Sequence, residues 1–111
     1  MGVTEAVATK TRFADLTFEE KLDRLAEVAV KIGLGLRAGQ ELIMSAPIEA
    51  LPLVRRITEH AYKAGALLVT TLYSDDPSVL ARYEYAQDAS FDFAPVWLQD
   101  GVAAGFRSGA A

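Results

Sequence analysis

Polar side chains that could take part in chemistry stand at the carboxyl ends of two segments with the composition of buried β-strands. The segments are residues 41–46 and 66–73, and the polar residues at or after their ends are Ser45, Glu49, Ser74, Asp75 and Asp76. In open α/β sheets the ligand crevice lies beyond the carboxyl ends of the strands. The sequence therefore predicts a small polar crevice, in which Asp75 and Asp76 could bind a metal ion or a hydroxyl group.

A structural role for the two aspartates is the alternative, and the residues around them favour it. The run from Ser74 to Pro77 is typical of a helix start, with Asp76 as the N-cap and Pro77 as the first helical residue. Asp75 would then lie beside the positive end of the helix dipole. We expect capping rather than ligand binding to account for these carboxylates.

The single histidine, His60, lies one step off the apolar stripe of a predicted helix. It could act as a general base or a lone metal ligand, but no Ser, Asp or His near it in sequence completes a catalytic set. We expect a histidine at the boundary between the apolar stripe and solvent, whose ring packs against the protein while one ring nitrogen contacts water. Arg55 and Arg56 could hold an anion, yet an exposed helix face explains them better. We assign no catalytic residue and no metal ligand.

The composition limits the chemistry further. With 111 residues the chain has room for one domain, and its 51% hydrophobic and 23% charged residues are ordinary for a globular protein. The absence of cysteine excludes disulfides and thiolate sites, and one histidine cannot build a multi-histidine metal site unaided. No apolar run approaches the roughly 18–20 residues that span a membrane, so we expect no membrane partner.

The net charge of −4 arises in the last third of the chain. Residues 74–111 hold two basic side chains against six acidic ones, namely Arg82 and Arg107 against Asp75, Asp76, Glu84, Asp88, Asp92 and Asp100. A basic stripe that could follow a phosphate backbone is missing, so nucleic acid is not an expected partner. The acidic residues also lack calcium-loop spacing and are interpreted as a solvated face.

Hydrophobic periodicity predicts elements in the order α-β-α-β-α-α. The first helix begins at a capping box formed by Thr17 and Glu20, and its predicted buried stripe is Leu22, Leu25, Ala26, Ala29 and Ile32. Strands over 41–46 and 66–73 flank a helix over 49–64, which has Pro52 in its first turn and Gly65 after its end. Two further helices begin near Pro77 and Pro95.

The strand–helix–strand order predicts an α/β fold, a βαβ-type layered unit with a short parallel sheet. We expect residues 17–111 to form a single partial domain and residues 1–16 a flexible extension. Two strands alone make a poor sheet with both outer edges unpaired. The unit is therefore expected to be an incomplete part of a larger domain, unless other chains supply the neighbours, as in a strand-exchanged oligomer.

Aromatic residues are concentrated between the acidic residues near the end of the chain. They are Tyr83, Tyr85, Phe91, Phe93 and Trp97. They could form a ligand or partner surface, but core packing of the last two helices is the favoured interpretation.

An ordered set of segments resembles the amino-terminal region of the thermophilic-type metalloaminopeptidases, the family of aminopeptidases T, S and II. The segments are LAEVAVKIG (25–33), AGQ (38–40), APIEA (46–50), LVR (53–55), AYKAGA (61–66) and YSDD (73–76). The resemblance covers roughly residues 18–86. No single segment is a catalytic motif, so the specificity comes from the order and spacing of the set.

The resemblance implies a longer, cytoplasmic parent enzyme that removes amino-terminal residues from peptides and is typically a homodimer. It also implies two divalent metal ions of the zinc or cobalt class, held by Glu, His and Asp ligands in the carboxy-terminal half. None of those ligands maps onto this sequence. We therefore expect a non-catalytic amino-terminal portion that is inactive alone and binds no metal. The alternative is a free-standing small α/β module for binding or as an adaptor.

Overall fold

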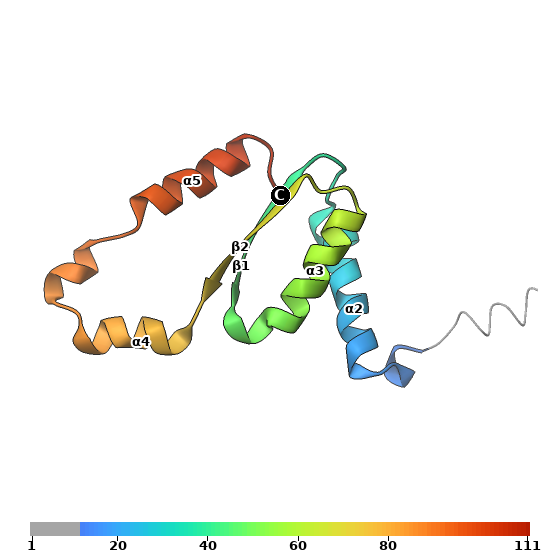
Figure 1. Ribbon diagram of the computed structural model, residues 1–111, viewed down its shortest axis with the longest axis horizontal. Helices are drawn as coiled ribbons and strands as arrows, with labels where there is room; N and C mark the ends of the chain where they lie inside the picture. Colours follow the sequence, from blue (N-terminus) through green and yellow to red (C-terminus); the bar gives the residue numbers. More distant parts are fainter. Residues whose placement is uncertain (1–11) are drawn as a thin grey trace, which may run out of the picture.

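The computed structural model describes residues 12–111, which form a two-stranded parallel sheet with helices on both sides (Figure 1). The elements are η1 (Phe13–Asp15), α2 (Phe18–Val28), η2 (Ala29–Leu34), β1 (Glu41–Pro47), η3 (Ile48–Ala50), α3 (Leu51–Lys63), β2 (Leu68–Ser74), α4 (Asp76–Tyr85), η4 (Asp88–Asp92) and α5 (Val96–Arg107). The predicted α-β-α-β-α-α order is confirmed. The expected extension over residues 1–16 falls largely outside the described residues, which include only residues 12–16 of it, with the short 3₁₀ helix η1.

Helix α2 starts at the predicted capping box. Thr17 Oγ1 accepts a hydrogen bond from the Glu20 amide at 3.1 Å, and the Glu20 carboxylate accepts one from the Thr17 amide at 3.0 Å. These bonds satisfy two amides that the first helical turn leaves without partners. The local sequence thus sets where the helix begins.

The predicted buried stripe of this first helix is partly wrong. Ala26 and Val30 are buried, whereas Leu25 is 53% exposed and Ile32 is 77% exposed. Beyond Val28 the chain continues as the π-helix η2, whose wider turn moves the side chains out of the 3.6-residue phase. The phase change places Val30 in the core and Ile32 in solvent.

The βαβ unit forms as predicted. Strands β1 and β2 run parallel with Leu42 opposite Val69, and α3 connects them. Gly65, which follows α3, has a φ of +96°, and a Cβ built there would lie 2.9 Å from Ala38 Cβ. This position therefore requires glycine both for its backbone conformation and for its close approach to Ala38.

The small hydrophobic core lies between the sheet and the first two helices. Val30, Leu42 and Ala61 form its fully buried cluster, and Ile57 and Val69 pack against them. The strands are otherwise only partly covered, since Leu68 is 49% exposed. The two segments have the composition of buried strands, and the described residues alone do not bury them fully.

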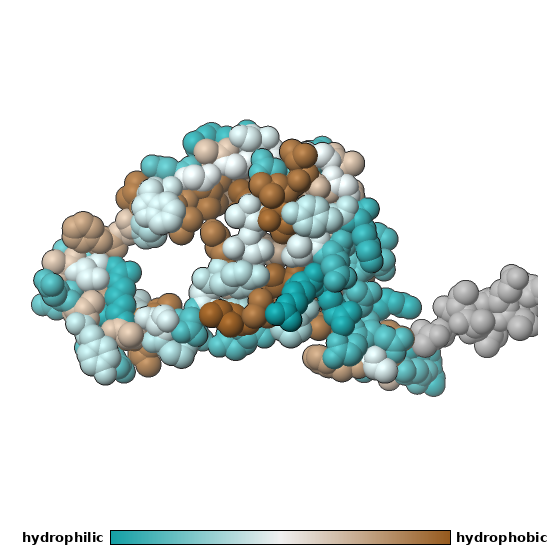
Figure 2. Space-filling model, viewed as in Figure 1, coloured by the Kyte–Doolittle hydropathy of each residue, from teal (hydrophilic) through white to brown (hydrophobic). Residues whose placement is uncertain are grey.

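Elements α4, η4 and α5 form an arm, which leaves the carboxyl end of β2 and returns to the amino end of β1 (Figure 1). The space-filling view shows an open space between this arm and the sheet (Figure 2). The expected core packing of the arm's aromatic residues is wrong. Tyr83, Tyr85, Phe91, Phe93 and Trp97 are between 45% and 82% exposed. The arm has too few neighbours among the described residues to bury them.

Candidate functional site

The carboxyl ends of the two strands lie side by side, as a crevice there requires. Pro47 of β1 is opposite Ser74 of β2, and Ser45 is opposite Leu72. Both serines are exposed, and so is Glu49 in η3. The geometry brings these segments together at the carboxyl end of the sheet. The ligand crevice there stays a prediction.

Asp75, rather than the predicted Asp76, is the N-cap of α4. Its backbone is extended, and its carboxylate accepts hydrogen bonds from the Ser78 amide at 3.3 Å and from the Ser78 hydroxyl at 2.7 Å. Asp76 and Pro77 are then the first two residues of the helix. The shift by one residue arises because the Asp75 carboxylate reaches the third residue of the helix, which is Ser78. Capping of this helix start by an aspartate is thus confirmed, but the capping residue is Asp75 and not Asp76.

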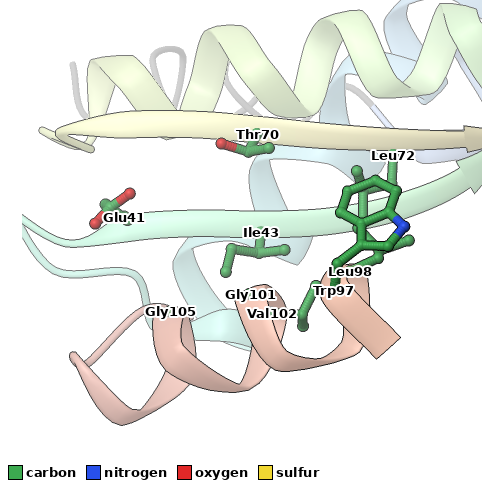
Figure 3. Close-up of a pocket in the computed structure, with 9 residues that line it drawn as sticks. All are labelled: Glu41, Ile43, Thr70, Leu72, Trp97, Leu98, Gly101, Val102 and Gly105. Carbon is green, nitrogen blue, oxygen red and sulfur yellow. The ribbon is translucent and has the colours of Figure 1, made fainter. Parts of the chain in front are cut away.

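An apolar groove lies between the open face of the sheet and α5 (Figure 3). At one end Ile43 and Leu72 of the strands face Leu98 and Val102 of the helix around a cavity of about 310 Å³. The helix approaches closely at Gly105, where a Cβ would lie 2.5 Å from Ile43 Cδ1. The polar side chains that line the groove include Glu41 of β1 and Thr70 of β2, which do not form a nucleophile–base pair. This groove is suited to apolar packing rather than to catalysis.

A charged cluster joins α2 to α3 around the single histidine. His60 is only 8% exposed, and its Nε2 lies 3.0 Å from Asp23 Oδ1. A carboxylate only accepts hydrogen bonds, so Nε2 carries the donated hydrogen. Nε2 is thus bound to Asp23, and the expectation that this histidine keeps one nitrogen in water stays a prediction for Nδ1. The hydrogen bond from His60 is the main cause that holds the pKa of Asp23 below its usual value.

Arg56 belongs to the same cluster, so the interpretation of Arg55 and Arg56 as a plain exposed face holds only for Arg55. Arg56 lies 2.7 Å from the Glu19 carboxylate and 3.5 Å from that of Asp23. Sequence reasoning missed this cluster because it looked for partners near His60 in sequence. The available signal was spacing, since Glu19 and Asp23 are four residues apart on one helix, and Arg56 and His60 are four apart on another.

None of these features forms a metal centre. Within residues 12–111 there is no group of three or more His, Cys, Asp or Glu side chains placed to hold a metal ion. The same part of the chain has no helix long and apolar enough to cross a membrane. The described residues therefore do not fit a two-metal site.

Comparison with known proteins assigns the chain to a class of metal-dependent peptidases. The thermophilic metalloprotease family M29 matches residues 18–111. The chain belongs to this family, as the resemblance predicted. The match also includes the tract after residue 86, which the resemblance in sequence did not cover.

Individual relatives agree with this assignment. Aminopeptidase T of Thermus thermophilus is 46% identical over 94 residues, which make up 85% of this chain and 23% of that protein. Aminopeptidase AmpS of Bacillus subtilis is 34% identical over 95 residues, or 86% of this chain and 23% of the relative. The solved structure of wild-type AmpT from Thermus thermophilus matches with a TM-score of 0.81 and 45% identity, covering 85% of this chain and 24% of that one. The chain thus spans about a quarter of the length of these relatives.

Proposed function

We propose that this chain is the amino-terminal, non-catalytic portion of a metal-dependent aminopeptidase that removes amino-terminal residues from peptides. The observation that carries the proposal is the 46% identity to Aminopeptidase T, combined with coverage of only 23% of that protein. Similarity of this kind over most of the chain favours a part of such an enzyme over a free-standing binding or adaptor module.

The metal chemistry belongs, in this proposal, to another part of the parent enzyme. Asp75 is engaged as a helix cap, and the single histidine is bound to Asp23. The described residues offer no third ligand beside either group. We propose that the parent holds two divalent ions of the zinc or cobalt class outside this chain, and that it is a cytoplasmic homodimer.

The βαβ unit would then act as a scaffold. Ser45, Ser74 and the start of α4 lie at the carboxyl ends of its parallel strands, where the rest of the enzyme could contact them. The polar crevice formed by Ser45, Glu49, Ser74, Asp75 and Asp76 is part of this proposal as a contact region rather than as a catalytic centre.

A graft tests the proposal. Residues 18–111 would replace the corresponding segment of Thermus thermophilus Aminopeptidase T, and hydrolysis of amino-acid amides would be measured with added zinc or cobalt. We expect the chimera to be active and the isolated chain to be inactive with either metal. A chimera with Leu42→Asp, which places a charge in the core, is the matched control and should lose activity through misfolding.

Two results would contradict the proposal. One is metal-stimulated hydrolysis by the purified 111-residue chain. The other is a chimera that is inactive although its circular dichroism and melting transition show a folded protein.

A further inference from the structure

Helix α2 exposes an apolar face that has basic side chains beside it. Phe18 is 72% exposed, and Leu25 and Val28 are about half exposed. Phe18, Leu22 and Leu25 recur at steps of four and three residues, the spacing of a helix face that packs against another apolar surface. A groove of about 390 Å³ on this face is lined by Phe18, Leu22, Leu25, Val28, Lys21 and Arg24. The groove therefore combines apolar walls with positive charge.

The arm carries an aromatic surface on its outermost part. Tyr83 of α4 and Phe91 of η4 stack with their ring centroids 5.6 Å apart, and the Arg82 guanidinium lies 5.6 Å from the centroid of the Phe91 ring. These contacts hold the two rings in place although Tyr83 is 68% exposed. Fixed, exposed aromatic rings are the side chains that most often carry the binding energy of protein interfaces.

The aromatic surface is negatively charged. Glu84, Asp88 and Asp92 lie next to the two rings in sequence and are all exposed. None of them takes part in an ion pair within residues 12–111. Arg82, the only arginine of α4 and η4, donates its hydrogen bonds to hydroxyl and carbonyl oxygens instead. A basic, apolar partner would therefore match both the rings and the carboxylates.

The groove of α2 has this chemistry, but the two surfaces do not meet within one molecule. Figure 1 shows α2 and the arm on opposite sides of the βαβ unit, with α3 and the sheet between them. Contact between them therefore needs a second molecule. Charge complementarity also selects the pairing, because two α2 grooves would bring basic side chains together and two arms would bring carboxylates together.

We propose that two copies of this chain associate through α2 and the arm, with Tyr83 and Phe91 of each copy packed on the α2 groove of the other and Glu84 facing Arg24. A contact between two different surfaces that is made twice about a twofold axis gives a closed dimer. Each contact removes exposed apolar side chains of both copies from water. The proposal concerns the surfaces of this chain and does not depend on peptidase activity.

Sedimentation equilibrium of the 111-residue chain between about 10 μM and 1 mM tests the proposal. We expect a reversible monomer–dimer equilibrium. Arg24→Glu and Glu84→Arg should each raise the Kd at least about tenfold, because each places like charges against one another at both contacts. An equimolar mixture of the two variants should return to within about threefold of the parent Kd. In the mixed dimer the reversed α2 meets the reversed arm, and the other contact is that of the parent.

Arg55→Glu on α3 and Asp100→Arg on α5 are the matched controls, since they make the same charge changes at exposed positions outside the two surfaces. They should leave the Kd unchanged, and circular dichroism should show that all four variants are folded. The proposal would be overturned by a parent chain that stays monomeric, by controls that weaken association as much as the test variants, or by a mixture that stays dissociated. A mass that keeps rising beyond the dimer would overturn the reciprocal arrangement.

Discussion

At the residue scale, the pairing of Asp23 with His60 shows how one contact connects two helices. The residues lie 37 positions apart in sequence, and the hydrogen bond between them joins α2 to α3. Arg56 adds a positively charged guanidinium 3.5 Å from the same carboxylate. The contact makes part of the stability of this helix pair dependent on the ionisation of Asp23.

We expect Asp23→Asn to weaken the dependence of stability on pH in the acid range. The pKa of Asp23 is lowered, chiefly by the hydrogen bond from His60, so its carboxylate stabilises the fold above the ordinary aspartate pKa of about 4. That contribution is lost as the pH falls through the lowered value. Urea unfolding at pH 6 and pH 3 should show a smaller loss in the variant than in the parent chain.

His60→Gln provides the control for this prediction. Without His60 the main cause of the lowered pKa is gone, so Asp23→Asn should have a smaller effect in that background. Equal effects of Asp23→Asn in both backgrounds would contradict the assigned pairing.

Gly65 is the second residue whose type the structure requires. We expect Gly65→Ala to lower the free energy of unfolding by more than about 2 kcal/mol, because a positive φ is combined with a collision against Ala38. Gly35 also has a positive φ but open space around it, so Gly35→Ala should cost only about 1 kcal/mol. Urea denaturation measures both, and equal losses would show that the contact with Ala38 is unimportant.

At the element scale, the arm of α4, η4 and α5 depends on a few polar contacts. Arg82 donates to the Ser90 hydroxyl at 3.0 Å, to the Ser90 carbonyl and to the Phe93 carbonyl at 3.0 Å. Its guanidinium also lies over the ring of Phe91, which stacks on Tyr83. These contacts hold η4 against α4 in the absence of a buried core.

We expect Arg82→Ala to loosen η4 and to destabilise the arm by about 1 kcal/mol. Limited proteolysis at residues 87–95 should become faster, while the βαβ core stays resistant. Arg107→Ala, which removes another arginine of the arm that makes none of these bonds, is the control and should leave cleavage unchanged. Unaltered cleavage in the Arg82 variant would show that other contacts hold η4.

At the scale of the whole molecule, apolar side chains are distributed over surfaces rather than gathered in a core. Only five apolar residues of the described part are buried, while α2, β2 and α5 expose large ones. Surfaces of this kind usually mark contacts with other protein parts. This agrees with a chain that spans about a quarter of its relatives' length.

Trp97 reports directly on this exposure, since the chain has one tryptophan and its side chain is 78% exposed. We expect the isolated chain to show the emission of a water-exposed indole and efficient quenching by acrylamide. Trp97→Phe should change the free energy of unfolding by less than about 0.5 kcal/mol. A blue-shifted emission protected from acrylamide would show that α5 is covered, for example by self-association.

The sequence by itself determined the local features and the family. The capping box at Thr17, Pro52 in the first turn of α3, the glycine after that helix and the parallel βαβ order all depend on residues close in sequence. Their signals are strong because caps, prolines and glycines act through the backbone within a turn. The position of the cap of α4 was predicted one residue too late, since two adjacent aspartates offer the same chemistry.

Only the tertiary structure decided which distant residues meet. It joined Asp23 to His60, placed Ala111 on the edge of β1 and left the aromatic residues of the arm exposed. No periodicity within one element contains this information, because it depends on how helices pack and on how many neighbours each surface has. The tertiary structure also decided the phase of the first helix, where a π-turn moved Val30 into the core and Ile32 into solvent.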